Sequence, residues 1–324
     1  MTRRGTGNER PVTTASSVPV TRDEELEGDE ALETLARTGR VRLVVDAVTR
    51  FRAADGFSHA RALAFQITLA ILPGIIAVVG LAATLDVDAF TAVVRDTIAQ
   101  LAPGAVGDIL TDALQQGTSA ARADSGETAL VGGALAAAIA GTTAMAQVER
   151  GANRIYGTER DRPFLRKYLN AALLAATAGT LAVASAALLV GGSAIRSALE
   201  WGDTFDAVWT IARWPVGAAL TIASVALLFE RAPRRRQPEA SWLAVGAAIA
   251  AALWLVFMAA LTVYVDATRN FGATYGPIAG TIGLLLWAML SAVALFGGLA
   301  VAAQLEAVRA GVPRPRVERD ENVV

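Results

Sequence analysis

The chain has 324 residues, of which 54% are hydrophobic and 18% are charged, and its mean hydropathy is +0.44. It has no cysteine and a single histidine, which excludes disulfides, thiolate metal sites and multi-histidine metal sites. Asp, Glu, Lys and Arg are all absent from six windows: 62–85, 128–148, 168–195, 214–229, 240–265 and 270–305. Since about 20 uncharged apolar residues are enough to cross a bilayer as a helix, the composition predicts an all-α polytopic membrane protein and argues against a soluble enzyme.

The first 54 residues predict two cytoplasmic elements. Residues 1–38 are polar and acidic with no apolar period, which is typical of a disordered tail. In residues 40–54 apolar side chains recur at helical spacing, at Val41, Val44, Val45, Val48 and Phe51. Arginines occupy several of the other positions, so this segment predicts an amphipathic helix. The pattern leaves open whether that helix lies on the inner membrane surface or packs on the helix bundle.

Residues 39–306 predict a membrane domain with six transmembrane helices. The expected spans are 60–85, 128–148, 168–195, 208–230, 240–265 and 278–305. Between the first two spans, residues 86–117 carry two apolar helical faces separated by a Pro-Gly pair, which predicts an outer helical hairpin. Residues 307–324 read as a second cytoplasmic tail.

The basic residues predict the orientation. Of the 29 Lys and Arg residues, 24 fall in the N-terminal segment, the second-to-third loop, the fourth-to-fifth loop and the C-terminal tail. By the positive-inside rule, this favours six spans with both termini in the cytoplasm. Eight of the loop residues could also bind anionic lipid head groups: Arg150, Arg154, Arg162, Arg166, Lys167, Arg234, Arg235 and Arg236. We expect membrane lipids as partners and no nucleic-acid binding, because topology already accounts for these residues.

A cavity or hinge is the candidate functional feature inside the membrane. Pro73 removes a backbone hydrogen bond and is predicted to kink or break the first span, and broken helices line substrate sites in transporters. The candidate residues are Gln66, Pro73, Gly74, Thr142, Thr143, Gly276, Gly280 and Gly283. The glycines could equally serve helix packing, and the small-xxx-small spacing from Gly276 to Gly280 leaves a homo-oligomer open.

Other candidate chemistry is sparse. Glu149 and Glu230 each precede an arginine at an inner span boundary, which predicts interfacial ion pairs with Arg150 and Arg231. His59 follows a serine and lies near an aspartate, but adjacency in sequence does not make a catalytic triad. We expect no catalytic residues, no metal site and no cofactor.

Several segments together resemble the YihY/BrkB family of bacterial inner-membrane proteins, historically labelled ribonuclease BN. They are Asp55–Gln66 through Leu72-Pro73, Asn153–Tyr156, Arg162–Phe164, Leu228–Pro233, Tyr264 with Ala273–Gly276, and Gly283–Ser291. The resemblance covers about residues 40–306 and implies six helices in a bacterial plasma membrane. One stretch departs from it: the family usually has Gly-Ala-Glu-x-Asn in the sixth span, where this chain has Gly298–Ala302 without acid or amide.

The resemblance does not fix an activity, but together with the predicted break at Pro73 and the small-residue interfaces it favours a transporter or lipid-handling permease of unknown substrate. The alternative is a non-transporting scaffold that maintains envelope integrity. The nuclease label fits poorly, since RNA hydrolysis commonly needs metal-bound carboxylates or a histidine acid–base pair.

Overall fold

The computed structural model describes residues 15–20, 28–85, 111–112, 114–115, 126–190, 203–267 and 279–317. Within these ranges the protein is all-helical, and the extended structure is limited to one isolated antiparallel bridge between Ala15 and Arg316. The predicted all-α class is therefore confirmed. The predicted outer hairpin 86–117 lies almost entirely outside the described residues. The candidate hinge residue Gly276 also lies outside them.

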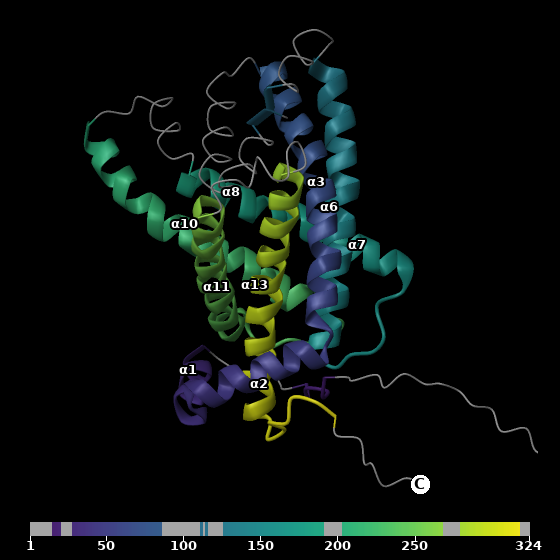
Figure 1. Ribbon diagram of the computed structural model, residues 1–324, viewed down its shortest axis with the longest axis vertical. Coiled ribbons are helices and arrows are strands. Elements are labelled where there is room, and N and C mark those ends of the chain that lie inside the picture. Colours follow the sequence, from purple (N-terminus) through teal and green to yellow (C-terminus); the bar gives the residue numbers. More distant parts are fainter. Residues whose placement is uncertain are drawn as a thin grey trace, which may run out of the picture.

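Within the described residues, the long helical segments form a bundle with two helices across one end (Figure 1). The end helices are α1 (Gly28–Thr38) and α2 (Arg40–Ala53). The bundle holds α3 (Gly56–Leu85), α6 (Gly126–Ile155), α7 (Phe164–Leu174), the π-helical η2 (Ala175–Gly179), α8 (Thr180–Val190), α10 (Asp203–Arg231), α11 (Ala240–Ala267) and α13 (Ala279–Arg309).

Five of the described helices are long and apolar enough to cross a membrane. They are Leu130–Ile155, Phe164–Leu189, Val208–Arg231, Ala240–Val265 and Gly280–Arg309, which correspond to the second to sixth predicted spans. Large apolar side chains point outward from them, as Leu135 on α6 and Leu255 on α11 show, each 63% exposed. Such a surface is suited to hydrocarbon rather than to water. The first predicted span falls in the 30-residue α3.

α13 is the centre of the bundle. Phe296, Leu299 and Leu305 on this helix are buried, and it packs against α2, α3 and α11. Glycine allows the closest of these approaches: a Cβ on Gly298 would lie 2.6 Å from the carbonyl oxygen of Gly246 on α11. Along α3 and α6, which run side by side (Figure 1), Gly133 has the same role, since its Cβ would lie 2.6 Å from the Ala77 nitrogen. Small residues thus set these helix contacts, as in other membrane bundles.

Pro73 does not break its helix. α3 continues as one α-helix from Gly56 to Leu85 with Pro73 inside it. Of the two predicted effects, a break of the first span is therefore wrong, and a kink at Pro73 stays a prediction. A proline removes one backbone donor, and a helix held along its length by α6 can keep its other hydrogen bonds.

The N-terminal region is more ordered than predicted. Residues 28–38 form α1, in which Ala31 is buried, and residues 15–20 include the buried Ala15 and Val18. The expectation of a disordered tail over 1–38 is therefore wrong for these two segments, because each places small apolar side chains against the bundle.

α2 forms where the sequence predicted an amphipathic helix, but it turns a different face to the protein. Its buried residues are Leu43, Ala47, Arg50, Phe51 and Ala53. The four predicted apolar valines are instead exposed, with Val41 at 79%. α2 therefore packs on the bundle through one face and keeps an apolar valine face outward. The sequence left open whether this helix packs on the bundle or lies on the inner membrane surface, and these two alternatives are compatible with each other.

Candidate functional site

The predicted cavity residues are only partly brought together. Thr143 on α6 donates a hydrogen bond of 3.0 Å to the Gln66 side chain on α3. Thr142 instead bonds the Ala138 carbonyl of its own helix. Gly280 and Gly283 lie buried near the start of α13. One turn further along the α3–α6 contact, Gln147 Nε2 lies 3.2 Å from His59 Nδ1. The two helices thus share a short row of polar contacts.

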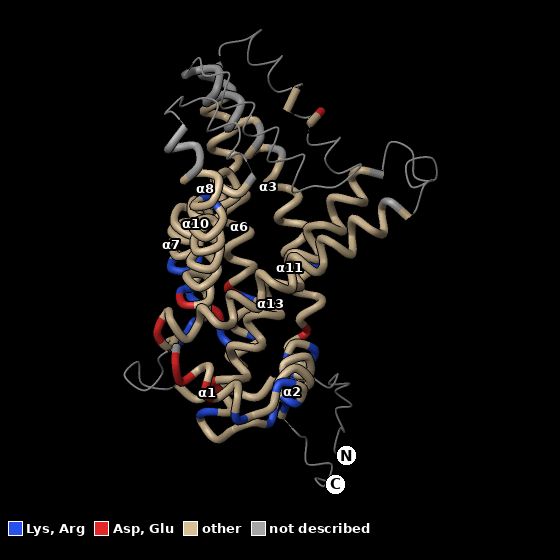
Figure 2. Tube along the Cα trace, turned by 90° about the vertical axis from the view of Figure 1, so that its left-hand side faces the viewer, with Lys and Arg blue, Asp and Glu red and all other residues tan. Residues whose placement is uncertain are grey.

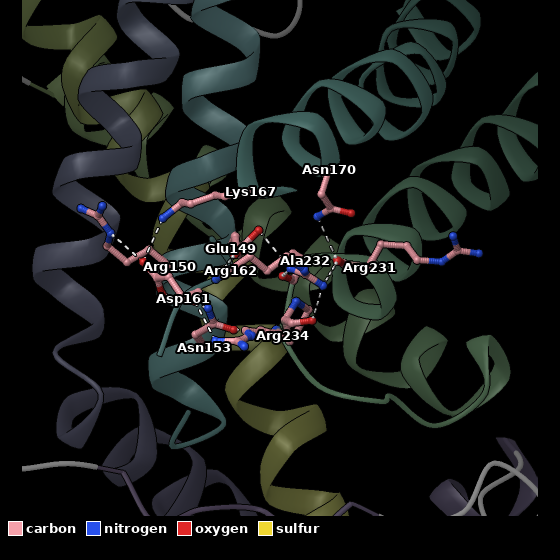
Figure 3. Close-up of polar contacts among 11 residues, drawn as sticks. Glu149, Arg150, Asn153, Asp161, Arg162, Lys167, Asn170, Arg231, Ala232 and Arg234 are labelled. Atoms are coloured by element: carbon pink, nitrogen blue, oxygen red, sulfur yellow. Dashed lines mark hydrogen bonds and ion pairs between the residues drawn. The ribbon is translucent and has the colours of Figure 1, made fainter. Parts of the chain in front are cut away.

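The charged residues gather toward the end of the bundle that carries α1 and α2 (Figure 2), which we call the basic end. Glu149, at the end of α6, is fully buried and forms an ion pair of 2.9 Å with Arg162 Nη1. Arg162 also donates to the carbonyls of Arg231, Ala232 and Pro233 at 3.2, 2.7 and 2.9 Å. A guanidinium in this position satisfies the carbonyls that the end of α10 leaves open (Figure 3).

Asp161 is the second anchor of this network (Figure 3). It accepts hydrogen bonds from Lys167 Nζ at 2.9 Å and Asn153 Nδ2 at 3.0 Å, and Arg150 Nε lies 3.5 Å away. Burial alone would raise the pKa of the Asp161 carboxyl, but the hydrogen bonds from Lys167 and Asn153 lower it below its ordinary value. Asn153 also accepts a 2.6 Å bond from the backbone of Arg234. The loop after α6 is thereby tied to the loop after α10.

One predicted ion pair was wrong and one is confirmed. Glu149 pairs with Arg162 rather than with its neighbour Arg150, whose guanidinium lies 3.5 Å from Asp161 instead. Glu230 and Arg231 do pair, at 2.8 Å and largely exposed.

A second polar cluster lies beside the first, around Arg50 of α2. The Arg50 side chain is completely buried, and its guanidinium donates to Gln304 Oε1 at 2.8 Å and to the Ile155 carbonyl at 3.1 Å. Its other donors bond Ser16, at the carbonyl at 2.8 Å and at the hydroxyl at 3.0 Å. These partners are all neutral, and burial lowers the pKa of Arg50 to about 10.

Arg235 completes this cluster. Its guanidinium forms a bidentate pair with the buried Glu306 carboxylate of α13, at 2.9 and 2.6 Å. It also stacks over the Tyr156 ring at 4.5 Å and donates to the Pro19 carbonyl at 2.9 Å. Burial raises the pKa of the Tyr156 hydroxyl, which lies beside these charges. We call Arg50, Arg235, Tyr156, Gln304 and Glu306 the arginine centre.

The predicted basic residues differ in how many contacts they make with the rest of the protein. Arg154 donates to the Glu159 carbonyl at 2.7 Å, whereas Arg166 and Arg236 are exposed. The acid and amide missing at Gly298–Ala302 have counterparts later in the same helix, where Gln304 and Glu306 are buried.

Sequence reasoning missed Arg50 and Tyr156. The available signal was that Arg50 shares a helical face with Leu43 and Ala47, at spacings of seven and three. The identity of their partners was not readable, because Ser16, Ile155 and Glu306 come from distant parts of the chain. Within the described residues no group of three or more His, Asp or Glu side chains could hold a metal ion.

Comparisons with known proteins find a membrane-protein relative, in agreement with the long apolar helices. The family model described as virulence factor BrkB matches residues 47–322. The chain is 26% identical over 254 residues to the ribonuclease-like protein YfkH of Bacillus subtilis (strain 168), an alignment that covers 77% of this chain and 90% of YfkH. It is 27% identical over 261 residues to the UPF0761 membrane protein azo3165 of Azoarcus sp. (strain BH72), covering 80% of this chain but only 62% of that protein. No solved structure matches it. The chain therefore belongs to the BrkB family of membrane proteins.

Proposed function

We propose that this protein is a transporter or lipid-handling permease of a bacterial plasma membrane. The observation that carries the proposal is a polar seam within the membrane helices, formed by Ser185, Thr221 and Ser224 at the contact of α7–η2–α8 with α10. Ser185 donates to the Gly217 carbonyl at 2.7 Å and lies 2.6 Å from the Thr221 hydroxyl. Ser224 donates to the carbonyl of Ala178, inside the π-helical η2, at 2.8 Å.

The π-helical turn η2 inside the third predicted span supports the proposal that this helix moves during transport. Such turns cost helix stability and are found frequently at functional sites. Here the hydroxyl of Ser224 bonds a carbonyl of the widened turn. A helix that can exchange these bonds can shift its register against α10, which is the kind of change that alternating access requires.

The six-span arrangement with both termini inside belongs to the same proposal. α3 supports it, because residues 62–85 contain no charged residue and the helix packs along α6. A homo-oligomer and lipid head groups remain expected partners, and nucleic-acid binding and catalysis are no part of the proposal. His59, the only histidine, contacts Gln147 rather than a carboxylate.

Reconstitution tests the proposal. Full-length protein is placed in vesicles that carry head-group-labelled phosphatidylglycerol or an encapsulated ion-sensitive dye, and lipid flipping and ion flux are measured. We expect flux above that of protein-free vesicles in one of these assays. Ser224→Ala should lower the rate by roughly fivefold, the equivalent of one buried hydrogen bond of about 1 kcal/mol.

The matched control is Thr262→Ala, since Thr262 on α11 is exposed and, within the described residues, bonds its own helix at the Met258 carbonyl. Equal effects of the two substitutions would remove the seam from the mechanism. Flux no greater than that of empty vesicles in either assay would favour the scaffold function. That second candidate is supported by the ion pairs and carbonyl bonds that fasten the basic end.

A further inference from the structure

Residues 15–20, which we call the strap, lie against the basic end. The Ser16 backbone donates to the Pro315 carbonyl at 3.1 Å, and the Ser16 hydroxyl bonds the Arg314 carbonyl. The Val18 backbone donates to the Tyr156 carbonyl at 3.2 Å. The strap is therefore held by the C-terminal segment on one side and by the end of α6 on the other.

The strap also supplies acceptors to both guanidiniums of the arginine centre. Arg50 donates from Nη1 to the Ser16 carbonyl and from Nη2 to the Ser16 hydroxyl, while Arg235 donates from Nη2 to the Pro19 carbonyl. Three guanidinium N–H groups, two from Arg50 and one from Arg235, thus donate to two residues of the strap, Ser16 and Pro19. Without the strap, these guanidinium donors would all face the position that its carbonyl and hydroxyl oxygens now occupy.

The arginine centre has more positive than negative charge. In the described contacts Arg235 pairs with Glu306, whereas every acceptor of Arg50 is neutral. Among the described residues, Arg235 Nε is buried nearby without a hydrogen-bond partner, and the Tyr156 hydroxyl is buried beside Gln237. Guanidinium groups bind carboxylate and phosphate oxygens more strongly than neutral carbonyls. Neutral acceptors leave such a buried charge only partly compensated.

We propose that Arg50, Arg235 and Tyr156 form a binding site for a phosphate-bearing anion, and that the strap carbonyls occupy this site in the present structure. A bound phosphate displaces residues 16–19 and accepts the three guanidinium donors together with a donor that now lacks a partner. Anion binding at this site does not depend on whether the protein is a transporter. The phosphate can belong to free phosphate or to the head group of an anionic lipid.

The first test is binding to the full-length protein in uncharged detergent, measured by isothermal titration calorimetry. The probes are inorganic phosphate and dioctanoyl phosphatidylglycerol. Arg50→Gln should weaken binding by at least about tenfold, since a charge-assisted hydrogen bond is lost. The control Arg52→Gln, on the exposed side of the same helix, should change it by less than about twofold. Unchanged binding by Arg50→Gln overturns the proposal.

The second test moves the strap and leaves both arginines in place. Because Ala15 and Arg316 face each other across an antiparallel bridge, cysteines at these positions fall within disulfide range. The chain has no other cysteine. The oxidised Ala15→Cys/Arg316→Cys protein should bind at least about tenfold more weakly than the reduced one. Equal affinity in the two forms contradicts a site beneath the strap, and this comparison decides even if Arg50→Gln fails to fold.

A third variant opens the strap. Val18 is 4% exposed, so Val18→Asp places a carboxylate in an apolar contact and should release the segment and tighten binding. Val20→Asp adds the same charge at a position that is 58% exposed and should not. Binding of inorganic phosphate to Val18→Asp identifies free phosphate as a ligand, and binding of the lipid alone identifies a head group. Binding of neither probe by this variant overturns the proposal.

Discussion

Loss of the buried Glu149 carboxylate should strongly destabilise the basic end. Its partner Arg162 would keep its charge but lose its only carboxylate among the described contacts. Removing one member of a buried ion pair costs roughly 3–5 kcal/mol, whereas an exposed pair contributes at most about 1 kcal/mol. Glu149→Gln should therefore lower the Tm strongly in detergent. Glu230→Gln, which breaks the exposed pair with Arg231, should barely change it. Similar shifts for both variants would contradict this account.

His59 should make stability depend on pH. Burial lowers the pKa of His59 below its ordinary value of 6.5, with a smaller raising influence from Asp55 and lowering influences from Arg154 and Arg150. The unfolded chain therefore binds a proton at a higher pH than the folded protein does. The contribution of neutral His59 is complete above pH 6.5 and is lost as the pH falls through the lower, folded-state pKa.

The check on His59 is a Tm measured from pH 7.5 to pH 5 in wild type and in His59→Gln. Wild type should lose more stability than the variant as the pH falls, since glutamine can contact Gln147 without taking up a proton. Parallel curves would show that other groups carry the pH dependence.

At the scale of helices, two neighbouring glycines of α6 should respond in opposite ways. A Cβ on Gly133 would lie 2.6 Å from the Ala77 backbone nitrogen of α3, so Gly133→Ala forces the two helices apart. A Cβ on Gly132 would meet nothing within 4 Å. Since alanine is favoured over glycine inside a helix by roughly 0.5–1 kcal/mol, Gly132→Ala should leave the Tm unchanged or raise it. Gly133→Ala should lower it. Equal changes would mean that the α3–α6 contact can relax.

The positions of the helices were readable from sequence because hydropathy is a local property. Five charge-poor windows fall in five long apolar helices, and the bounds differ mainly where a helix continues past the uncharged stretch, as α6 does to Ile155. The face that a helix buries was less readable. On α2 the valines suggested the buried side, yet Arg50 is buried because carbonyls and Gln304 satisfy its donors.

The π-helical η2 also had no signal in the sequence. Its residues Ala175–Gly179 are small and uncharged, like many others in the spans. What distinguishes them is the hydroxyl of Ser224, which comes from α10 and meets the Ala178 carbonyl only in the folded bundle. Contacts of this kind depend on the packing of distant segments, which periodicity and composition do not describe.

For the molecule as a whole, the sequence predicted that the basic residues gather on one side, but it did not predict which groups they contact. The sequence placed most basic residues on alternating loops, and the charges of the described residues do gather toward one end of the bundle (Figure 2). For the loop arginines the sequence indicated a role in orientation and left lipid head-group binding open. Several of them instead hold the protein together, as Arg162 does at the end of α10 and Arg235 does with Glu306.

Whether α3 crosses the membrane decides the topology, and the absence of native cysteines makes it directly testable. Single cysteines at Arg42, Ser119 and Arg160 are labelled with a membrane-impermeant maleimide in right-side-out vesicles. With six spans, Ser119→Cys should react in sealed vesicles, and Arg42→Cys and Arg160→Cys only after permeabilisation.

The pair Arg42→Cys and Ser119→Cys isolates α3, because that helix is the one long apolar segment between them. If α3 does not cross, both positions lie on the same side and react together. If it does, they react oppositely, and the exposed valine face of α2 then lies on the same side of the membrane as the loop of Arg160. The positive-inside rule predicts the second pattern, since 24 of the 29 basic residues would remain in the cytoplasm.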